Sequence, residues 1–324
     1  MFKPVLVIAR KDISDALRDR FITIVTLFLA IAALVSLVTG AISLSADVAA
    51  YEESKALLIG LGKDASALSA PNFRPLSLLR GAIEQIEIIG AVLGILAGFR
   101  SAASERGRQT LALIMTRPVA AWQFLAGKLG AAMVLLGSCL AIVLALGMVL
   151  LPLVSGLGLG GGDVGRIFLV WLAGTAYTSV FFILSFVLTL WMKHTGNALL
   201  IAFVVWLVLV LVAPQIGDTM DPDNQVAGGV FRQLQVPKAE EDRIKASYGT
   251  FESIRTFIEA ASITKHFERF SFAVLGIKDT YAGKPLGPIL VEKKGDALWI
   301  IFASLGLAVL MFALPLNSNR LAKE

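Results

Sequence analysis

Charged residues and cysteines are scarce in this sequence. Only 16% of its 324 residues are charged and 56% are hydrophobic, whereas about 25% of the residues in an ordinary soluble domain are charged. This shortage of charge excludes a soluble globular fold and favours lipid as the surrounding solvent. The single cysteine, Cys139, lies in an apolar run, so the sequence has neither a disulfide framework nor a cysteine-based metal site.

Motifs that bind nucleotides or metals are also lacking. No Gly-x-x-x-x-Gly-Lys-Ser/Thr occurs, so this chain does not hold the phosphates of ATP in a P-loop, and we expect no cofactor in it. The glycines of 156–161 follow an apolar helix instead of a strand, so we interpret them as a tight turn and not a dinucleotide site. His194 and His266 have no second ligand at metal-binding spacing. The net charge of +5 is typical of basic cytoplasmic loops in a membrane protein and does not indicate nucleic acid as a partner.

Six apolar stretches are long enough to cross a membrane. A helix needs about 20 apolar residues to cross about 30 Å of hydrocarbon. The predicted spans are 21–44, 81–99, 129–154, 167–191, 197–214 and 297–315. The sequence therefore predicts an all-α membrane protein with six transmembrane helices, and because the number is even, both termini lie on the same side.

The distribution of basic residues assigns that side. Lys and Arg in short loops are held back from translocation, and thirteen of them lie on the side of the termini against five in the short loops of the other side. Both termini are therefore predicted to be cytoplasmic, and the long segment 215–296 is placed outside. The predicted parts are an interfacial helix (1–20), spans one to five with a cytoplasmic loop at 100–128 (21–214), an extracytoplasmic segment (215–296), and span six with a cytoplasmic tail (297–324).

The regions flanking the spans carry helical patterns of their own. In 1–20 the apolar residues recur at three- and four-residue steps, which predicts an amphipathic helix lying in the membrane interface. In the extracytoplasmic segment, 238–275 reads as helix, and Ile244, Tyr248 and Ile254 belong to a face expected to pack. That segment is interpreted either as a helical cap on the spans or as a substrate- or partner-binding domain. The outer loop 45–80 is interpreted as a connector.

The cytoplasmic loop 100–128 is charged and longer than a simple turn. Ser104 is expected to cap a short helix, and Pro118 is expected to end it because its ring excludes the helical conformation for the preceding residue. From the residues alone, this helix is either an amphipathic connector at the membrane surface or a docking site for a partner. The turn at 193–196 is likewise either a solvated turn or a second docking point.

The loop contains a pattern of motifs that matches a known family. The pattern runs from Ser104-Glu105-Arg106-Gly107-Arg108-Gln109-Thr110-Leu111 through Met115-Thr116-Arg117-Pro118-Val119 to Gly127-Lys128. In order and spacing it resembles the loop after the second span of ABC-2-type exporter permeases. Gly107 and Gln109 depart from the family pattern, which has a second acidic residue and a glycine at these positions. The whole chain looks most like the branch with an enlarged outer segment between spans five and six.

The resemblance implies a partner that supplies energy. It implies that the loop forms a coupling helix that inserts into a separate ATPase subunit, which binds ATP and Mg²⁺. The residues implied in coupling are Glu105, Arg106, Arg108, Thr110, Leu111, Ile114, Arg117, Pro118 and Lys128. It further implies two copies of the ATPase, a second permease copy that is identical or a close paralogue, and a multi-pass location in the prokaryotic cytoplasmic (inner) membrane, in contact with lipid.

Two acidic residues stand out in span two. Glu84 and Glu87 are one helical turn apart at its outer end, and Arg80 precedes Glu84 by four residues. They are interpreted either as interface residues paired with Arg80, or as the polar lining of a translocation path or a cation site, because an ionised side chain deep in lipid costs about 2.5–3.5 kcal/mol. The second interpretation supports an alternative function, a secondary transporter or channel that couples to ions through Glu84 and Glu87.

The remainder of span two favours close helix packing. Its glycines at 90, 94 and 98 form Gly-x-x-x-Gly-x-x-x-Gly, a pattern that allows two helix backbones to approach each other. The spans contain no histidine and only these two carboxylates, so the sequence offers no constellation for an intramembrane enzyme. We expect no enzymatic activity in this chain.

Overall fold

The chain is helical wherever its structure is described. The computed structural model describes residues 3–18, 20–61, 75–107, 120–156, 158–220, 230–234 and 236–313, and these contain no β-strand. The α-helices are α1 (Lys3–Arg18), α2 (Arg20–Gly60), α3 (Arg80–Gln85), α4 (Ala91–Gly107), α6 (Ala121–Ser155), α7 (Gly161–Trp191), α8 (Thr195–Trp206), α9 (Ala213–Met220), α10 (Val230–Gln233), α11 (Lys238–Ser247), α12 (Gly249–Ala261), α13 (Ile263–Leu275), α14 (Leu286–Glu292) and α15 (Lys294–Ala313). The 3-10 helices are η2 (Pro75–Leu79) and η6 (Asp279–Tyr281), and the π-helical turns are η3 (Ile86–Gly90) and η4 (Leu207–Val212).

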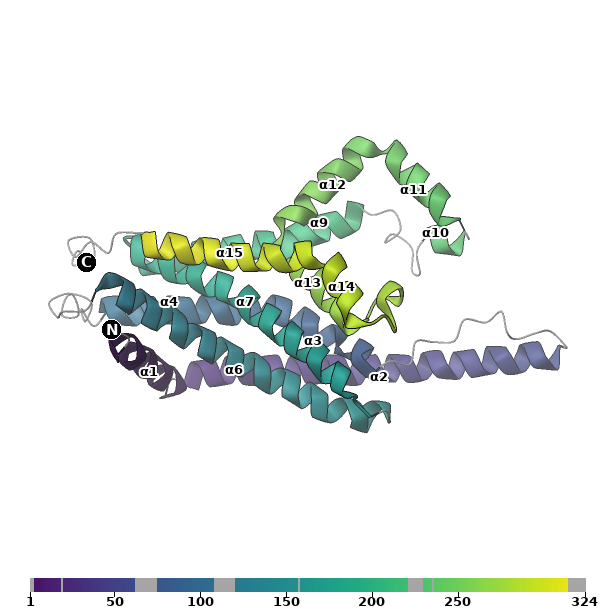
Figure 1. The fold of residues 1–324 in the computed structure, drawn as a ribbon, viewed down its shortest axis with the longest axis horizontal. Coiled ribbons are helices and arrows are strands. Elements are labelled where there is room, and N and C mark those ends of the chain that lie inside the picture. Colours follow the sequence, from purple (N-terminus) through teal and green to yellow (C-terminus); the bar gives the residue numbers. More distant parts are fainter. Residues whose placement is uncertain are drawn as a thin grey trace.

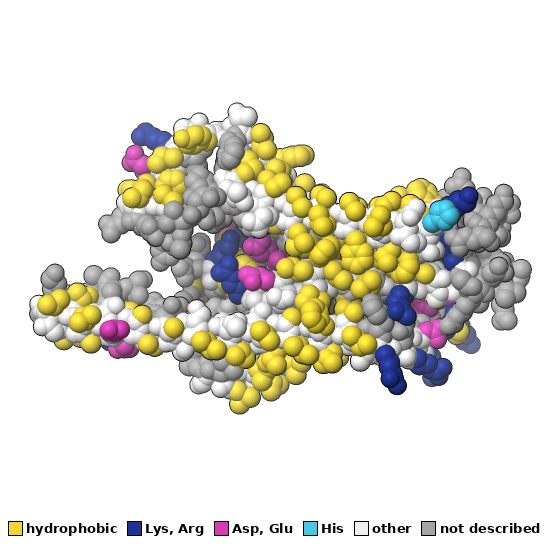
Figure 2. Space-filling view, turned by 180° about the vertical axis from the view of Figure 1, so that it is seen from behind, with side chains coloured by type: hydrophobic (Ala, Val, Ile, Leu, Met, Phe, Trp, Pro, Cys, Tyr) yellow, Lys and Arg dark blue, Asp and Glu magenta, His cyan; other side chains and the backbone are white. Residues whose placement is uncertain are grey.

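Six helical stretches are long and apolar enough to cross a membrane, which confirms the all-α architecture with six spans. Within the described residues they are Ile22–Gly60, Pro75–Arg106, Ala121–Leu153, Gly161–Trp191, Thr195–Ile216 and Lys294–Ala313. Hydrophobic side chains cover the middle of the bundle, whereas the coloured charged side chains lie mainly toward its two ends (Figure 2). Apolar surface of this kind is expected where lipid takes the place of water.

The bundle has two distinct ends. At one end, here called the near end, lie α1, the end of α4, the turn between α7 and α8, and the end of α15 (Figure 1). At the opposite end, here called the far end, α9 and α11–α14 gather between spans five and six (Figure 1). The beginning of α1 and the end of α15 thus share the near end, as an even number of spans requires.

Helix α2 extends well beyond the bundle at the far end (Figure 1). It has 41 residues, which at 1.5 Å per residue is about 60 Å, twice the thickness of the hydrocarbon layer. The interpretation of 45–80 as a connector is therefore wrong for 45–60. The helix continues because residues 45–59 include strong helix formers and neither proline nor glycine.

Helices α4 and α7 form the closest contact between two spans. A Cβ atom added to Gly94 would lie 2.5 Å from the carbonyl oxygen of Thr178, and one added to Gly98 would collide with the carbonyl oxygen of Phe182. A Cβ on Gly90 would lie 3.2 Å from Cγ2 of Thr178. The predicted role of the three glycines in close helix packing is confirmed.

The predicted helix 238–275 is divided into α11, α12 and α13. Breaks occur at Tyr248 and at Ser262, whose hydroxyl caps α13 by accepting a hydrogen bond from the backbone N–H of Lys265. The face predicted to pack is exposed at Ile244, Tyr248 and Ile254, so at these positions it does not pack against the rest of this chain. Helix α13 packs against α7, α15 and the far end of span two.

Candidate functional site

The coupling residues implied by the sequence fall into two groups. Arg108, Thr110, Leu111, Ile114, Arg117 and Pro118 belong to 108–119, outside the described residues. Glu105 and Arg106 lie at the end of α4, and Lys128 lies in the first turns of α6. The structure therefore places these three residues on the helices that enter and leave the loop.

The loop is shorter than the sequence indicated. Helix α4 continues without a break through Ser104 to Gly107, and the hydroxyl of Ser104 donates to the carbonyl of Ser101 at 3.2 Å. The expectation that Ser104 caps a new helix is therefore wrong, because its own backbone is already helical. Since α6 begins at Ala121, the connection between the two helices is reduced to 108–120.

Four charged side chains meet where α1, α4 and α6 converge at the near end. Lys128, which is 1% exposed, places its Nζ 2.8 Å from Oδ1 of Asp12 and 2.9 Å from Oε1 of Glu105. Nζ of Lys11 lies 2.9 Å from the same oxygen of Glu105. We call Lys11, Asp12, Glu105 and Lys128 the near-end ion cluster. Its charges balance, as buried charges require, because an unpaired one costs several kcal/mol.

The environment of Asp12 in the cluster combines two opposing effects. Burial raises the pKa of its carboxyl above the ordinary value, whereas the charge and hydrogen bond of Lys128 act in the opposite direction. The hydroxyl of Ser101 also donates to Oδ2 of Asp12 at 3.1 Å. Asp12 thus connects α1 to both α4 and α6.

A glycine allows α1 to approach α6 closely enough for these contacts. A Cβ on Gly127 would lie 2.8 Å from Cβ of Ile8 and 3.0 Å from the carbonyl oxygen of Val5. Gly127 therefore provides the space for α1, and Lys128 provides the charged contact that holds it. This gives a physical reason for the Gly-Lys pair at the start of the third span.

Arg106 fastens the end of α4 to the turn between α7 and α8. Its NH1 donates to the carbonyls of Thr189 at 2.7 Å and Met192 at 2.6 Å, and its NH2 donates to that of Lys193 at 3.1 Å. These carbonyls stand at the end of α7, where they have no partner within the helix. The end of α4 and the turn that carries His194 are thus joined by one side chain.

A cavity of about 790 Å³ opens beside the ion cluster, between α1, α4 and α6. One part of its wall is charged, with Asp15, Arg18 and Arg100, and another part is apolar, with Leu135 and Phe182. The cavity separates α1 from α4 over part of their length, so the ion cluster is a principal contact between these two helices.

At the far end, Glu84 and Glu87 lie in different environments. Nε of Arg80 lies 3.0 Å from Oε1 of Glu84, which confirms the pairing that their spacing indicated, and Glu84 is half-buried. Glu87 is only 8% exposed, and its Oε1 atom accepts no hydrogen bond. The two carboxylates are therefore not equivalent.

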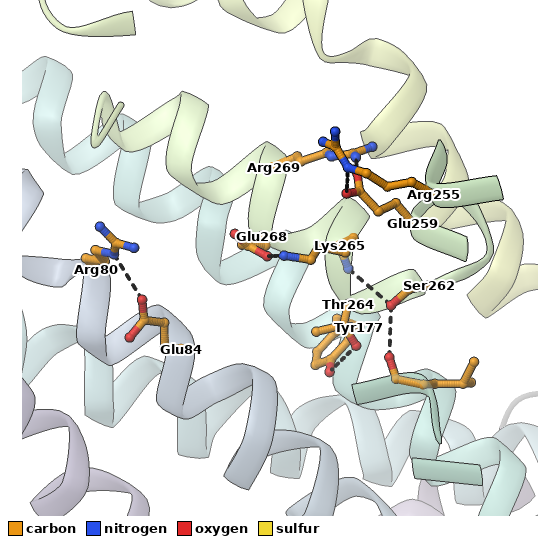
Figure 3. Close-up of polar contacts among 11 residues, drawn as sticks. Arg80, Glu84, Tyr177, Arg255, Glu259, Ser262, Thr264, Lys265, Glu268 and Arg269 are labelled. Atoms are coloured by element: carbon orange, nitrogen blue, oxygen red, sulfur yellow. Dashed lines mark hydrogen bonds and ion pairs between the residues drawn. The ribbon is translucent and has the colours of Figure 1, made fainter. Parts of the chain in front are cut away.

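Glu87 lies in the π-helical turn η3, and the backbone of this turn is bonded to α7. The hydroxyl of Tyr177 donates to the carbonyl of Glu87 at 2.8 Å. It also lies 3.2 Å from Oγ1 of Thr264 at the start of α13 (Figure 3). The ring of Tyr177 stacks on that of Phe267 in the same helix. Tyr177 therefore joins span two to α13.

The second π-helical turn, η4 in span five, makes a similar contact. The hydroxyl of Ser262 donates to the carbonyl of Leu209 in η4 at 2.9 Å. The start of α13 is thus bonded directly to span five and through Tyr177 to span two. We call this arrangement of Tyr177, Leu209, Ser262 and Thr264 the α13 seat.

Further ion pairs surround the seat. Lys265 pairs with Glu268 at 2.9 Å, and Glu259 pairs with both Arg255 and Arg269 (Figure 3). A hollow with charged side chains lies between the projecting end of α2 and the arch of α9–α12 (Figure 2). In the described part of the chain, no group of three His, Cys, Asp or Glu residues is arranged to hold a metal ion.

Sequence reasoning did not identify Asp12, Tyr177 or Ser262. For two of them a signal was present. Asp12 is an acidic residue beside the apolar stripe of the N-terminal helix, and Tyr177 is the only tyrosine in the uncharged span 167–191. Ser262 had no such signal, because its partner Leu209 is 53 residues away.

Comparison with known proteins identifies a family. A family model described as ABC-2 family transporter protein matches residues 6–318. No curated protein matches the chain. The matched region contains the near-end ion cluster, the loop 108–119, all six spans and the α13 seat.

Proposed function

The chain belongs to the ABC-2 family of transporter proteins, and on this basis we propose that it is the permease subunit of an exporter driven by a separate ATPase subunit. In this proposal the ATPase binds and hydrolyses ATP with Mg²⁺. The permease contributes the membrane path, and it either moves a substrate or transmits force across the membrane.

The near-end ion cluster and Arg106 are the observation that supports this function most directly. Glu105 and Lys128 flank the loop, and both bond to residues outside it. A displacement of the loop would be transmitted by Lys128 and Glu105 to α1, and by Arg106 to the end of α7. Such contacts suit a part that receives motion from a partner and passes it to the spans.

In this proposal, the residues of the loop and those at its base have different roles. Arg108, Thr110, Leu111, Ile114, Arg117 and Pro118 would contact the ATPase. Glu105 and Lys128, at 3% and 1% exposure, have little surface to offer a partner, so they would act as positioning residues. Arg106 would hold the second docking point, around His194, next to the first.

The assembly in this proposal has four subunits. Two permease copies, identical or closely related, would pair with two copies of the ATPase in the cytoplasmic (inner) membrane of a prokaryote. Both termini and the loop 108–119 would face the cytoplasm, as the distribution of Lys and Arg predicts. The segment 215–296, with its helical cap, would lie outside.

Co-purification from the native host tests the function. The tagged chain should retain an ABC-type ATPase subunit, and Leu111→Asp in the loop should release it. Leu61→Asp is the matched control, because Leu61 is 70% exposed at the far end of the molecule. Failure of the unmodified chain to retain the ATPase, or equal retention by both variants, would contradict the proposal.

One observation supports the alternative of an ion-coupled secondary transporter or channel. Glu87 is a buried carboxylate with an oxygen that has no hydrogen-bond partner, whereas Glu84 is paired with Arg80 and half-buried. Transport by the purified chain in vesicles, driven by an ion gradient with no ATPase present, would favour this alternative. A strict requirement for the ATPase would exclude it.

A further inference from the structure

Glu87 is a buried acidic residue with no cation paired to its carboxylate among the described residues. Its side chain is 8% exposed, its Oε1 atom is buried, and no donor reaches that atom. Burying a carboxylate without a compensating hydrogen bond or cation is strongly unfavourable. The Glu87 carboxylate therefore requires a compensating positive charge.

The charged neighbours do not supply the missing partner. On α3, Arg80 is engaged by Glu84, and on α13, Lys265 is engaged by Glu268 (Figure 3). The charges of these four residues all act on the Glu87 carboxyl, and each of the two cations is already paired with another carboxylate. The only titratable group of α7 near it, Tyr177, is committed to the backbone carbonyl of Glu87. One negative charge remains uncompensated.

The geometry limits what can compensate this charge. A divalent metal ion is usually held by several charged ligands, and no group of three His, Cys, Asp or Glu residues is arranged to hold one in the described part of the chain. The buried Oε1 atom has no surface against which a bulky ammonium or guanidinium group could lie. A small ligand with a single positive charge satisfies both limits.

We propose that Glu87 binds one small monovalent cation, a proton or an alkali metal ion, and that this ligand holds α13 in its seat on spans two and five. The site lies in a π-helical turn, a distortion that frequently marks functional positions in helices. It also lies beside the contact through which Tyr177 joins span two to Thr264 of α13. Without the cation, the uncompensated charge of Glu87 repels Glu268 across the contact between η3 and α13, and α13 leaves its seat.

The bound cation acts as a latch, by which we mean that it holds α13 in its seat at the far end and releases it when the solution outside changes. With the cation bound, the seat of α13 closes the outer end of the bundle. Loss of the cation, at high pH or at low alkali concentration, opens the contact between span two and α13. Cation binding at Glu87 is independent of the energy source for transport, so it stands or falls separately from coupling to an ATPase.

Thermal unfolding of the purified full chain, followed by tryptophan fluorescence, tests the site. Melting temperatures are measured from pH 5 to pH 9 in choline chloride, and then at fixed high pH with added NaCl or KCl. The unmodified chain should melt at a temperature that rises when pH falls or alkali ions are added, by an amount on the order of a few degrees. A response to pH in choline identifies the proton, and a response to NaCl or KCl at fixed pH identifies the alkali ion.

Two variants make the result specific. Glu87→Gln has an uncharged amide in place of the carboxylate, so it should fold, melt at least as high as the unmodified chain at pH 9, and lose the response. Glu84→Gln is the matched control and should keep the response, because Glu84 is already paired with Arg80. Failure of Glu87→Gln to fold, or an equal response in Glu87→Gln and the unmodified chain, would overturn the proposal.

Amide hydrogen exchange in 263–275 tests the latch directly. Exchange in α13 of the unmodified chain should be several-fold faster at pH 9 in choline than in Glu87→Gln under the same conditions, which removes the intrinsic effect of pH from the comparison. Equal exchange rates in the two chains would contradict a latch at this position.

Discussion

Glu105 and Lys128 lie on opposite sides of the loop 108–119, and their Oε1 and Nζ atoms are 2.9 Å apart although both side chains are buried. This buried ion pair connects the helix that precedes the loop, α4, to the helix that follows it, α6. Because Lys128 also bonds Asp12 of α1, the base of the loop and the N-terminal helix form one unit.

Removal of Lys128 should be much more damaging than removal of Lys11. Lys128→Met leaves the carboxylates of Asp12 and Glu105 without their buried partner, so we expect a loss of about 3–5 kcal/mol in unfolding free energy. Lys11→Met is the matched control, since Lys11 is 44% exposed and exposed pairs contribute at most about 1 kcal/mol. Denaturant unfolding in detergent measures both variants, and equal losses would show that the cluster is not the anchor of α1.

The ion cluster shows which part of the site could be predicted from the sequence. The resemblance of Gly127-Lys128 to a family motif indicated a functional position. It did not indicate Asp12 as the partner, because 116 residues separate Lys128 from Asp12. Local sequence predicts helices and spans, but contacts between distant segments depend on how the helices pack.

Gly98 should tolerate substitution far less than Gly130. Gly98→Ala places a methyl group against the carbonyl oxygen of Phe182 in α7, so α4 and α7 must separate, at a cost of about 1–3 kcal/mol. Gly130→Ala, in α6, meets no atom within 4 Å and should be neutral or slightly stabilising. Melting temperatures of the two variants in detergent provide the measurement. A Gly98→Ala chain as stable as Gly130→Ala would mean that α4 and α7 are not in close contact.

The π-helical turns show why other parts could not be predicted. Leu207–Val212 looks like ordinary apolar helix, and neither Glu87 nor Gly90 in Ile86–Gly90 indicates a π-helical turn by itself. The carbonyls of Glu87 and Leu209 accept hydrogen bonds from Tyr177 and Ser262, which come from distant parts of the chain. The glycine pattern of span two, by contrast, predicted its close packing correctly, because close approach requires small residues at regular spacing.

Tyr177→Phe should loosen α13 while leaving the core otherwise intact. The phenylalanine keeps the stacking on Phe267, but the carbonyl of Glu87 and the hydroxyl of Thr264 lose their shared partner. An unsatisfied buried polar group costs about 1–3 kcal/mol. We expect faster amide exchange in 263–275, measured by mass spectrometry, with unchanged exchange in α6. Tyr248→Phe is the control, since Tyr248 is 65% exposed. Identical exchange of α13 in the two variants would argue against the seat.

Tyr281 should ionise at unusually high pH. Burial raises the pKa of its hydroxyl to about 12, and the hydrogen bond that it donates to Glu292 acts in the same direction. Because the folded pKa is above the ordinary value of about 10, this group's contribution to stability is complete below pH 10 and is lost as the pH rises through about 12. The tyrosinate absorbance of the unmodified chain minus that of Tyr281→Phe should show one group titrating near pH 12. A difference spectrum that titrates near pH 10 would contradict this environment.

Chemical labelling of single cysteines should establish which end of the bundle faces the cytoplasm. Ser104 at the near end and Ser54 on the projecting part of α2 are both exposed, whereas the native Cys139 is buried and accepts a hydrogen bond from Thr26, so background labelling is low. A membrane-impermeant maleimide added to intact cells should label Ser54→Cys and not Ser104→Cys, because the basic residues at the near end are held back from translocation. Inverted membrane vesicles, in which the cytoplasmic side faces the reagent, should give the opposite result. Labelling of Ser104→Cys in intact cells would place the loop outside the cell, out of reach of any cytoplasmic ATPase. It would remove the mechanical basis of coupling even though the family assignment would stand.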